Sequence, residues 1–260
     1  GGATPVPGTT YTVNTTTQTG SDAGCVATPG DCTLTEAINA TNTNPGPDTI
    51  TFDIPGNTNP VLPITTELPT ITGAITFNAS TNGDCFGVGV TLDGTGAVPG
   101  ARGFVLDQQS TDPGGLTSIL GLGVTGFRSD GIVIRNARDV LVDCSSSRAN
   151  AAGVLIRDAT DITLGTQSDS VYIVGNTNDG LDIRNSARVR VIGAHLGTPY
   201  FAGYGNGGSG AWVTDSTDVH IHASRIGGNG GDGVAVYGNS SRVRIYADYI
   251  MVGNGGDAID

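Results

Sequence analysis

A short phrase returns about every 25 residues in the second half of the chain, and it constrains the fold more than any other feature. Each copy opens with Gly and continues with residues at which apolar side chains alternate; the openings are Gly131, Gly153, Gly180, Gly210 and Gly233, and a further copy begins at Ala258. A repeat this short cannot bury an apolar face alone, so it has to stack on its neighbours. Alternation with period two is typical of a half-buried β-strand. The chain is therefore expected to form a β-solenoid.

Each repeat carries two more apolar segments after the opening strand. The second segment holds pairs such as Val219 and Ile221, and the third, weaker segment holds single residues such as Leu196 and Ile226. Coils of three short strands pair in parallel, about 4.8 Å apart, around an aliphatic interior. We predict an all-β fold, a parallel β-helix with three short strands per coil.

The repeat does not extend over the first third of the chain. Thr33 followed by Glu36 forms a capping-box pattern ahead of an amphipathic helix, which we expect to cover the open end of the core. One strand is expected over residues 119–124, and loops are expected around 55–63, 78–87 and 93–102. The predicted regions are an extended segment at 1–30, a capping-helix region at 31–48, and a β-helix at 49–260 with irregular coils to about 116 and regular coils over 117–260.

The net charge of the chain disfavours two classes of binding partner. Its formal net charge is -12, and its 12 basic residues are all Arg. Such a surface repels nucleic acids and anionic membranes. No segment is long and apolar enough for a transmembrane helix, so we expect neither nucleic-acid binding nor membrane insertion.

The four cysteines have different expected states. Cys25 and Cys32 flank a turn-rich segment, and we expect them to form a disulfide, with two free thiols as the alternative. Cys144 continues the inward register of Val140 and Val142 and is expected to be a buried small hydrophobe. Nothing in the sequence indicates the state of Cys85.

Two polar columns accompany the repeat. Asn side chains at one turn position can bond to one another and to turn backbone, because the amide both donates and accepts. The first column, four residues before each opening residue, is Asn176, Asn206, Asn229 and Asn254. The second column, five residues after it, is Asn136, Asp158, Asn185 and Asp215. We interpret both columns as structural ladders.

The amino-terminal third resembles a known module. The segments that carry the resemblance are Cys32 to Ile38 (CTLTEAI), Asn42, Asp48 to Gly56 (DTITFDIPG) and Glu67 to Thr72 (ELPTIT). Together they are similar to the amino-terminal module of CSLREA-type surface proteins of bacteria and archaea, although Thr35 stands where that motif usually has Arg. The resemblance implies a right-handed parallel β-helix of the pectate-lyase-like superfamily and a secreted or cell-surface location. It implies no catalytic residues.

Outward positions of the regular coils are the candidates for chemistry. On the second strand, the catalytic candidates are Arg190, His220, His222 and Arg244. A basic stripe of this kind could hold an acidic polysaccharide, and a His or Arg could remove a proton next to a carboxylate. The candidate ligand-binding residues around it are Asp182, Arg184, Trp212, Tyr237 and Tyr246. The alternative is an ordinary solvated face without function.

Asp residues also recur just before the opening Gly, and Asp179 and Asp232 are the candidates for a Ca²⁺ site. The alternative is structural, because Asp-Gly is a common turn dipeptide. No cofactor other than Ca²⁺ is expected, and the choice between a Ca²⁺ site and a structural turn stays open.

The last repeat begins at Ala258 and stops within its first strand. We therefore expect either that the chain is part of a longer surface protein or that another copy covers this end, stacking end to end into a filament. The favoured function is an extracellular structural or adhesive module with a polysaccharide or surface partner. The alternatives are a polysaccharide lyase or glycoside hydrolase acting on an acidic polysaccharide, and a self-assembling filament subunit.

Overall fold

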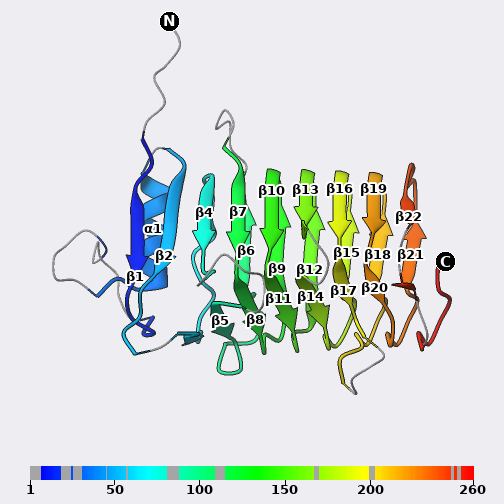
Figure 1. The fold of residues 1–260 in the computed structure, drawn as a ribbon, viewed down its shortest axis with the longest axis horizontal. Helices are drawn as coiled ribbons and strands as arrows, with labels where there is room; N and C mark the ends of the chain where they lie inside the picture. The colour runs from blue at the N-terminus through cyan, green and yellow to red at the C-terminus, as the bar shows by residue number, and fades with distance from the viewer. Residues whose placement is uncertain are drawn as a thin grey trace, which may run out of the picture.

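The chain winds into a parallel β-helix whose coils stack along one long axis (Figure 1). The computed structural model describes residues 7–18, 25, 31–44, 46–56, 58–80, 88–108, 115–166, 170–198, 203–246, 249–250 and 253–260. Every strand pairing within these residues is parallel, and each regular coil contributes one strand to each of three sheets. The β-helix predicted from the repeat is confirmed.

The three sheets are named A, B and C. Sheet A contains β1 (Thr10–Val13), β2 (Asp48–Phe52), β4 (Ile75–Asn78), β7 (Thr117–Leu120), β10 (Arg138–Asp143), β13 (Thr160–Leu164), β16 (Ala187–Ile192), β19 (Thr217–His222) and β22 (Arg244–Tyr246). Sheet B contains β3 (Val61–Pro63), β5 (Val90–Asp93), β8 (Leu122–Thr125), β11 (Ser145–Arg148), β14 (Val171–Val174), β17 (Ala194–Leu196), β20 (Arg225–Ile226) and β23 (Tyr249–Ile250). Sheet C contains β6 (Phe104–Asp107), β9 (Asp130–Arg135), β12 (Ala152–Arg157), β15 (Leu181–Arg184), β18 (Ala211–Thr214) and β21 (Val234–Tyr237).

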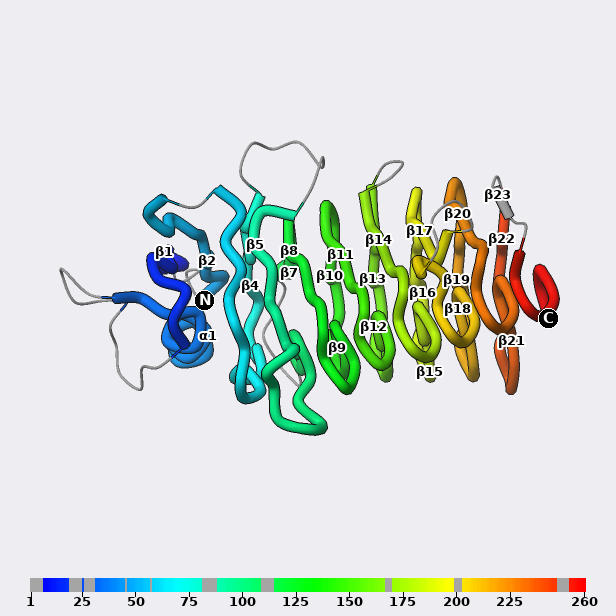
Figure 2. The backbone as a smooth tube through the Cα atoms, turned by 90° about the horizontal axis from the view of Figure 1, so that it is seen from below, coloured from blue at the N-terminus to red at the C-terminus, as the bar shows by residue number. Residues whose placement is uncertain are grey.

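The backbone coils lie directly above one another (Figure 2). Alternate residues of each strand are buried and align from coil to coil, so the interior consists of aliphatic columns. One column of sheet C, buried throughout, is Phe104, Ile132, Val154, Leu181, Ala211 and Val234. The neighbouring positions point outward. The register therefore determines which polar side chains lie next to one another on each outer face.

The opening Gly of each repeat is required by close packing. A methyl group at Gly180 would lie 2.5 Å from Nδ2 of Asn206 and 2.8 Å from the carbonyl oxygen of Gly210. At Gly153 it would lie 2.3 Å from the carbonyl oxygen of Gly180. These separations are far shorter than van der Waals contact, so neighbouring coils could not keep their spacing around a larger residue.

The Asn residues that precede these glycines form a continuous ladder. The side chain of Asn176 donates to Oδ1 of Asn206 over 3.0 Å, Asn206 donates to Asn229 over 3.0 Å, and Asn229 donates to Asn254 over 3.1 Å. The ladder begins one coil earlier than predicted, because Oδ1 of Asn176 also accepts from the backbone of Asn150. Asn150 precedes its Gly by three residues instead of four, so constant spacing misses it.

The second polar column forms the corner between sheets C and A. Asn136, Asp158, Asn185 and Asp215 have φ angles of 48°, 52°, 45° and 47°. This left-handed conformation is tolerated best by Gly, Asn and Asp, which explains the residue types at the corner. The structural interpretation of both columns holds.

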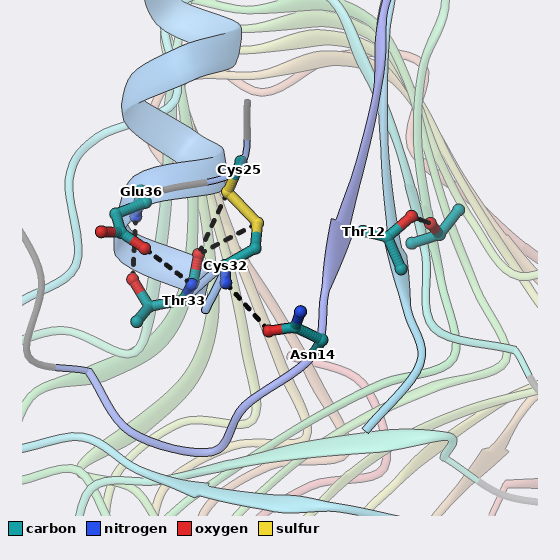
Figure 3. Close-up of a disulfide and its surroundings, with 7 residues drawn as sticks. Thr12, Asn14, Cys25, Cys32, Thr33 and Glu36 are labelled. Atoms are coloured by element: carbon teal, nitrogen blue, oxygen red, sulfur yellow. Dashed lines mark hydrogen bonds between the residues drawn. A yellow bond between two sulfur atoms is a disulfide. The ribbon is translucent and has the colours of Figure 1, made fainter. Parts of the chain in front are cut away.

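The helix α1 (Leu34–Thr43) lies beside β1 and β2 at the amino-terminal end of the stack (Figure 1). Its capping box is present, since Thr33 Oγ1 accepts from the backbone of Glu36 and the Glu36 carboxylate accepts from the backbone of Thr33. A disulfide between Cys25 and Cys32 joins the preceding segment to the start of the helix (Figure 3). The predicted cap and the predicted disulfide are both present.

Three local predictions were wrong. Residues 61–63 form β3 although a loop was expected there. Residues 119–124 belong to two strands, because Gly121, at φ 74°, turns the chain from sheet A into sheet B. Cys144 occupies the equivalent corner at φ 51°; it is only partly buried and is disulfide-bonded, so it is not a core residue. Cys85 lies outside the described residues.

Candidate functional site

The outer face of sheet C carries a pair of aromatic rings. Trp212 on β18 and Tyr237 on β21 have ring centroids 4.5 Å apart and planes inclined by 35°. Trp212 is half-buried, whereas Tyr237 is 39% exposed. Aromatic side chains at such positions present a broad apolar surface with a polar tip.

An ion pair stands directly beside the rings. Asp182 on β15 is in register with Trp212, and Arg184 follows two residues later on the same outer face. Arg184 Nε donates to both carboxylate oxygens of Asp182, over 2.8 and 2.9 Å. Asp182 is only 7% exposed, whereas Arg184 is exposed, so the carboxylate is buried and the guanidinium covers it from the solvent side. The clamp fixes the direction of both side chains.

Two further carboxyl groups lie near Asp182. Burial, followed by the charge of Asp182, raises the pKa of Asp130 above its ordinary value, and Arg102 and Arg184 offset this only in part. Burial also raises the pKa of Asp179, although that carboxylate accepts a hydrogen bond of 2.7 Å from the backbone of Ser209. A carboxyl group with a raised pKa keeps its proton to higher pH and is suited to donate it. Carboxyl groups with perturbed pKa values that interact with Asp182, the register partner of Trp212, mark a candidate site along sheet C.

Arg102 reaches the same region from an earlier coil. It forms a two-pronged ion pair with Glu67, with contacts of 2.6 and 3.1 Å. Burial alone would raise the pKa of Glu67, but hydrogen bonds from Arg102 outweigh it and lower that pKa. Glu67 therefore largely neutralises the positive charge of Arg102, which lowers the pKa of Asp130 only in part.

The outer face of sheet A carries the basic candidates. Arg190, His220 and Arg244 are aligned on β16, β19 and β22. The adjacent column holds His222 and Tyr246, whose rings are parallel within 6° with centroids 5.0 Å apart. The register places these five side chains on one patch, as the alternation of the second strand predicted.

The two groups of candidates do not lie on one sheet. Asp182, Arg184, Trp212 and Tyr237 belong to sheet C, and the Arg and His column with Tyr246 belongs to sheet A. The corner at Asn185 and Asp215 separates them. The expectation that the first-strand residues extend the basic stripe is therefore not met within a single sheet.

The candidates for Ca²⁺ occupy a turn ladder. Oδ1 of Asp179 accepts from the backbone of Ser209, and Oδ1 of Asp232 accepts from the backbone of Asp257, each over 2.7 Å. Within the part of the chain that the structure describes, no group of three or more His, Cys, Asp or Glu side chains is arranged to hold a metal ion.

Sequence reasoning missed one aromatic stack on sheet B. The ring of His195 stacks on Tyr172 with centroids 4.4 Å apart, and Arg225 approaches its Nε2 to 3.4 Å. These residues occupy matching outward positions of β14, β17 and β20. The signal is weak because the third strand is short and its outward positions alternate over too few residues.

The comparisons with known proteins agree with the observed architecture. A family model described as the right-handed beta helix region matches residues 102–259. Comparison with curated protein sequences gives no match. No helix within the described residues is long and apolar enough to cross a membrane.

Several solved structures are similar. A mutant of the periplasmic alginate epimerase AlgG has a TM-score of 0.50 and 12% identity, over 85% of this chain and 52% of its own. The chain thus spans about half the length of that structure. A protein from Parabacteroides merdae with an inferred glycosyl hydrolase activity has a TM-score of 0.43 and 12% identity, over 83% of this chain and 87% of its own. The A-module of mannuronan C-5 epimerase AlgE4 from Azotobacter vinelandii has a TM-score of 0.26 and 11% identity, over 87% of this chain and 94% of its own.

Proposed function

The chain belongs to the family of right-handed β-helix proteins, and from that premise we propose that it binds and cleaves a polysaccharide along the outer face of sheet C. A fold of this kind hosts many functions, so the proposal depends on the site. Its main support is the alignment of Asp182 with Trp212, which sets a clamped carboxylate beside an aromatic surface.

The aromatic pair suits a sugar ring. The C–H faces of a pyranose are apolar and pack against aromatic rings, while its hydroxyl groups need hydrogen-bond partners at the rim. Asp182 and Arg184 supply an acceptor and donors next to Trp212. The parallel coils continue this face along the axis of the helix, which suits an extended polymer.

The carboxyl groups supply the chemistry of a glycosidase. Asp130, with its raised pKa, would give its proton to the glycosidic oxygen as the C–O bond breaks. A water molecule would add to the anomeric carbon and lose a proton to the Asp182 carboxylate, which would also stabilise the positive charge that develops there. Proton exchange with solvent would then restore both carboxyl groups. If this face bound the polysaccharide without cleaving it, the protein would act as an adhesive module. The binding step is therefore common to the two functions.

The proposed location is outside the cytoplasm. The chain holds the Cys25–Cys32 disulfide and a further disulfide-bonded cysteine, Cys144. Disulfides persist in oxidising compartments and are rare in the cytosol. The resemblance of residues 32–72 to CSLREA-type modules supports the same location, and end-to-end association of copies stays a prediction for light scattering.

A panel of polysaccharides tests the activity. We expect one polymer, neutral or acidic, to yield new reducing ends without the ultraviolet absorbance of unsaturated sugars. Asp130→Asn should abolish product, and Asp53→Asn, an exposed carboxylate in an early coil, should leave it unchanged. Unsaturated products would identify a lyase and contradict the hydrolytic assignment. Binding without product from any polymer would contradict cleavage and leave the adhesive function.

A further inference from the structure

Two arginines of sheet A differ from most others in the chain. Seven arginines form ion pairs with described carboxylates: Arg102, Arg135, Arg138, Arg157, Arg184, Arg188 and Arg242. Arg190 and Arg244 are exposed and form no ion pair with any carboxylate in the described parts of the chain. They occupy the same outward column, one strand on either side of His220.

The two acidic groups that interact with Arg190 and Arg244 on this face already have arginine partners of their own. Asp161 pairs with Arg188, and Asp218 pairs with Arg242 through contacts that include 2.7 and 2.8 Å. Hydrogen bonds from these arginines lower the pKa of both carboxyl groups. Arg190 and Arg244 therefore have no ion-pair partner among the described carboxylates, although the net charge of the protein is -12.

An aromatic surface adjoins the two charges. Tyr246 is 48% exposed and stacks on His222, and its ring meets His220 edge-on with centroids 6.3 Å apart. The face thus combines cationic and aromatic side chains at the spacing of the coils, about 4.8 Å.

We propose that the outer face of β16, β19 and β22 is a second carbohydrate site, which binds an anionic polysaccharide through Arg190, His220 and Arg244. A polymer lying along the helix axis would meet one basic side chain on each coil, and a sugar ring would pack on Tyr246. This site lies on a different sheet from the proposed cleavage site and does not depend on it.

Charge density favours a polysaccharide over a nucleic acid as the ligand. Duplex DNA carries one negative charge per ~1.7 Å of its axis, and the protein as a whole is strongly negative. A polyuronate carries one charge per sugar, so it is repelled less by the rest of the surface. Its spaced carboxylates also suit isolated arginines better than a continuous phosphate backbone does.

Binding of polygalacturonate by the intact chain tests the proposal, measured by calorimetry at several salt concentrations. We expect Arg190→Ala/Arg244→Ala to weaken binding about tenfold, which corresponds to about 1.4 kcal/mol. Arg128→Ala/Arg148→Ala is the matched control. It removes two exposed arginines elsewhere, so the net charge becomes the same while the column stays intact. Tyr246→Ala should weaken binding without any change in charge.

Three results would overturn the proposal. Wild-type affinity in Arg190→Ala/Arg244→Ala would show that the column does not bind the polymer. Equal losses in the two double variants would show that only net charge matters. Binding of single-stranded DNA as tight as that of polygalacturonate would identify a different ligand. Product formation by the same variants reports on sheet C, so failure of this site and failure of the proposed function are distinguishable.

Discussion

Trp212 packs against Tyr237 with ring centroids 4.5 Å apart, one coil from the next along the outer face of sheet C. If this pair holds a sugar ring, Tyr237→Ala should raise the dissociation constant for the bound polysaccharide about fivefold, or about 1 kcal/mol. Tyr246→Ala, on sheet A, should leave this constant unchanged. Affinity electrophoresis in gels containing the polymer measures both, and equal losses would contradict the placement of the ring.

The repeat Gly residues should be intolerant of a side chain. Gly180→Ala forces a methyl group to 2.5 Å from Asn206 and should destabilise the fold by about 1–3 kcal/mol. Gly96→Ala is the control, because nothing lies within 4 Å of the added methyl group, and it should be neutral or slightly stabilising. Denaturant unfolding compares the two variants. Equal stabilities would show that the coils can shift apart at no cost.

The ionised carboxylate of Asp130 should reduce the free energy of unfolding at neutral pH. Its pKa is raised in the folded state by burial and by the charge of Asp182. The folded state therefore binds the proton more tightly, and stability falls as pH rises from the ordinary value of 3.8 through the folded pKa. Asp130→Asn should raise the melting temperature at pH 7, and the gain should vanish below the ordinary pKa, where the carboxyl group is neutral in both states. A gain that is independent of pH would contradict this explanation.

The disulfide at the cap should stabilise the amino-terminal end. It closes a short loop between Cys25 and Cys32, for which chain entropy predicts about 2 kcal/mol. Cys25→Ser/Cys32→Ser should lower the free energy of unfolding by that amount, as measured under non-reducing conditions. Unfolding indistinguishable from that of the wild type would mean that the cap is held by its capping box and packing alone.

The interior and its ladders could be predicted from the sequence, because they repeat a local rule. Period-two alternation specifies which residues of each strand are buried, and constant spacing identifies Asn176, Asn206, Asn229 and Asn254. The predictions fail where the spacing changes, as at Asn150, or where a single left-handed residue such as Gly121 divides one apolar run between two sheets.

Less of the candidate site could be predicted from the sequence. The alternation correctly selects Asp182 and Trp212 as outward residues, but it does not give the angle at the corner that separates them from Arg190. The pKa of Asp130 is raised by burial and by the charge of Asp182, two strands away across the sheet, and Arg102 from the preceding coil lowers it in part. Such relationships arise from the stacking of coils and have no signature in any one repeat.

Trp212 is the only tryptophan in the chain, so its emission reports directly on the proposed sugar-binding face. The most direct measurement is a titration of Asp130→Asn, which should bind without cleaving, with the polymer that the wild type degrades. We predict a saturable change in tryptophan emission, with weaker affinity after Tyr237→Ala and unaltered affinity after Arg190→Ala/Arg244→Ala. Emission that stays constant while calorimetry shows binding would contradict the assignment of sheet C as the site.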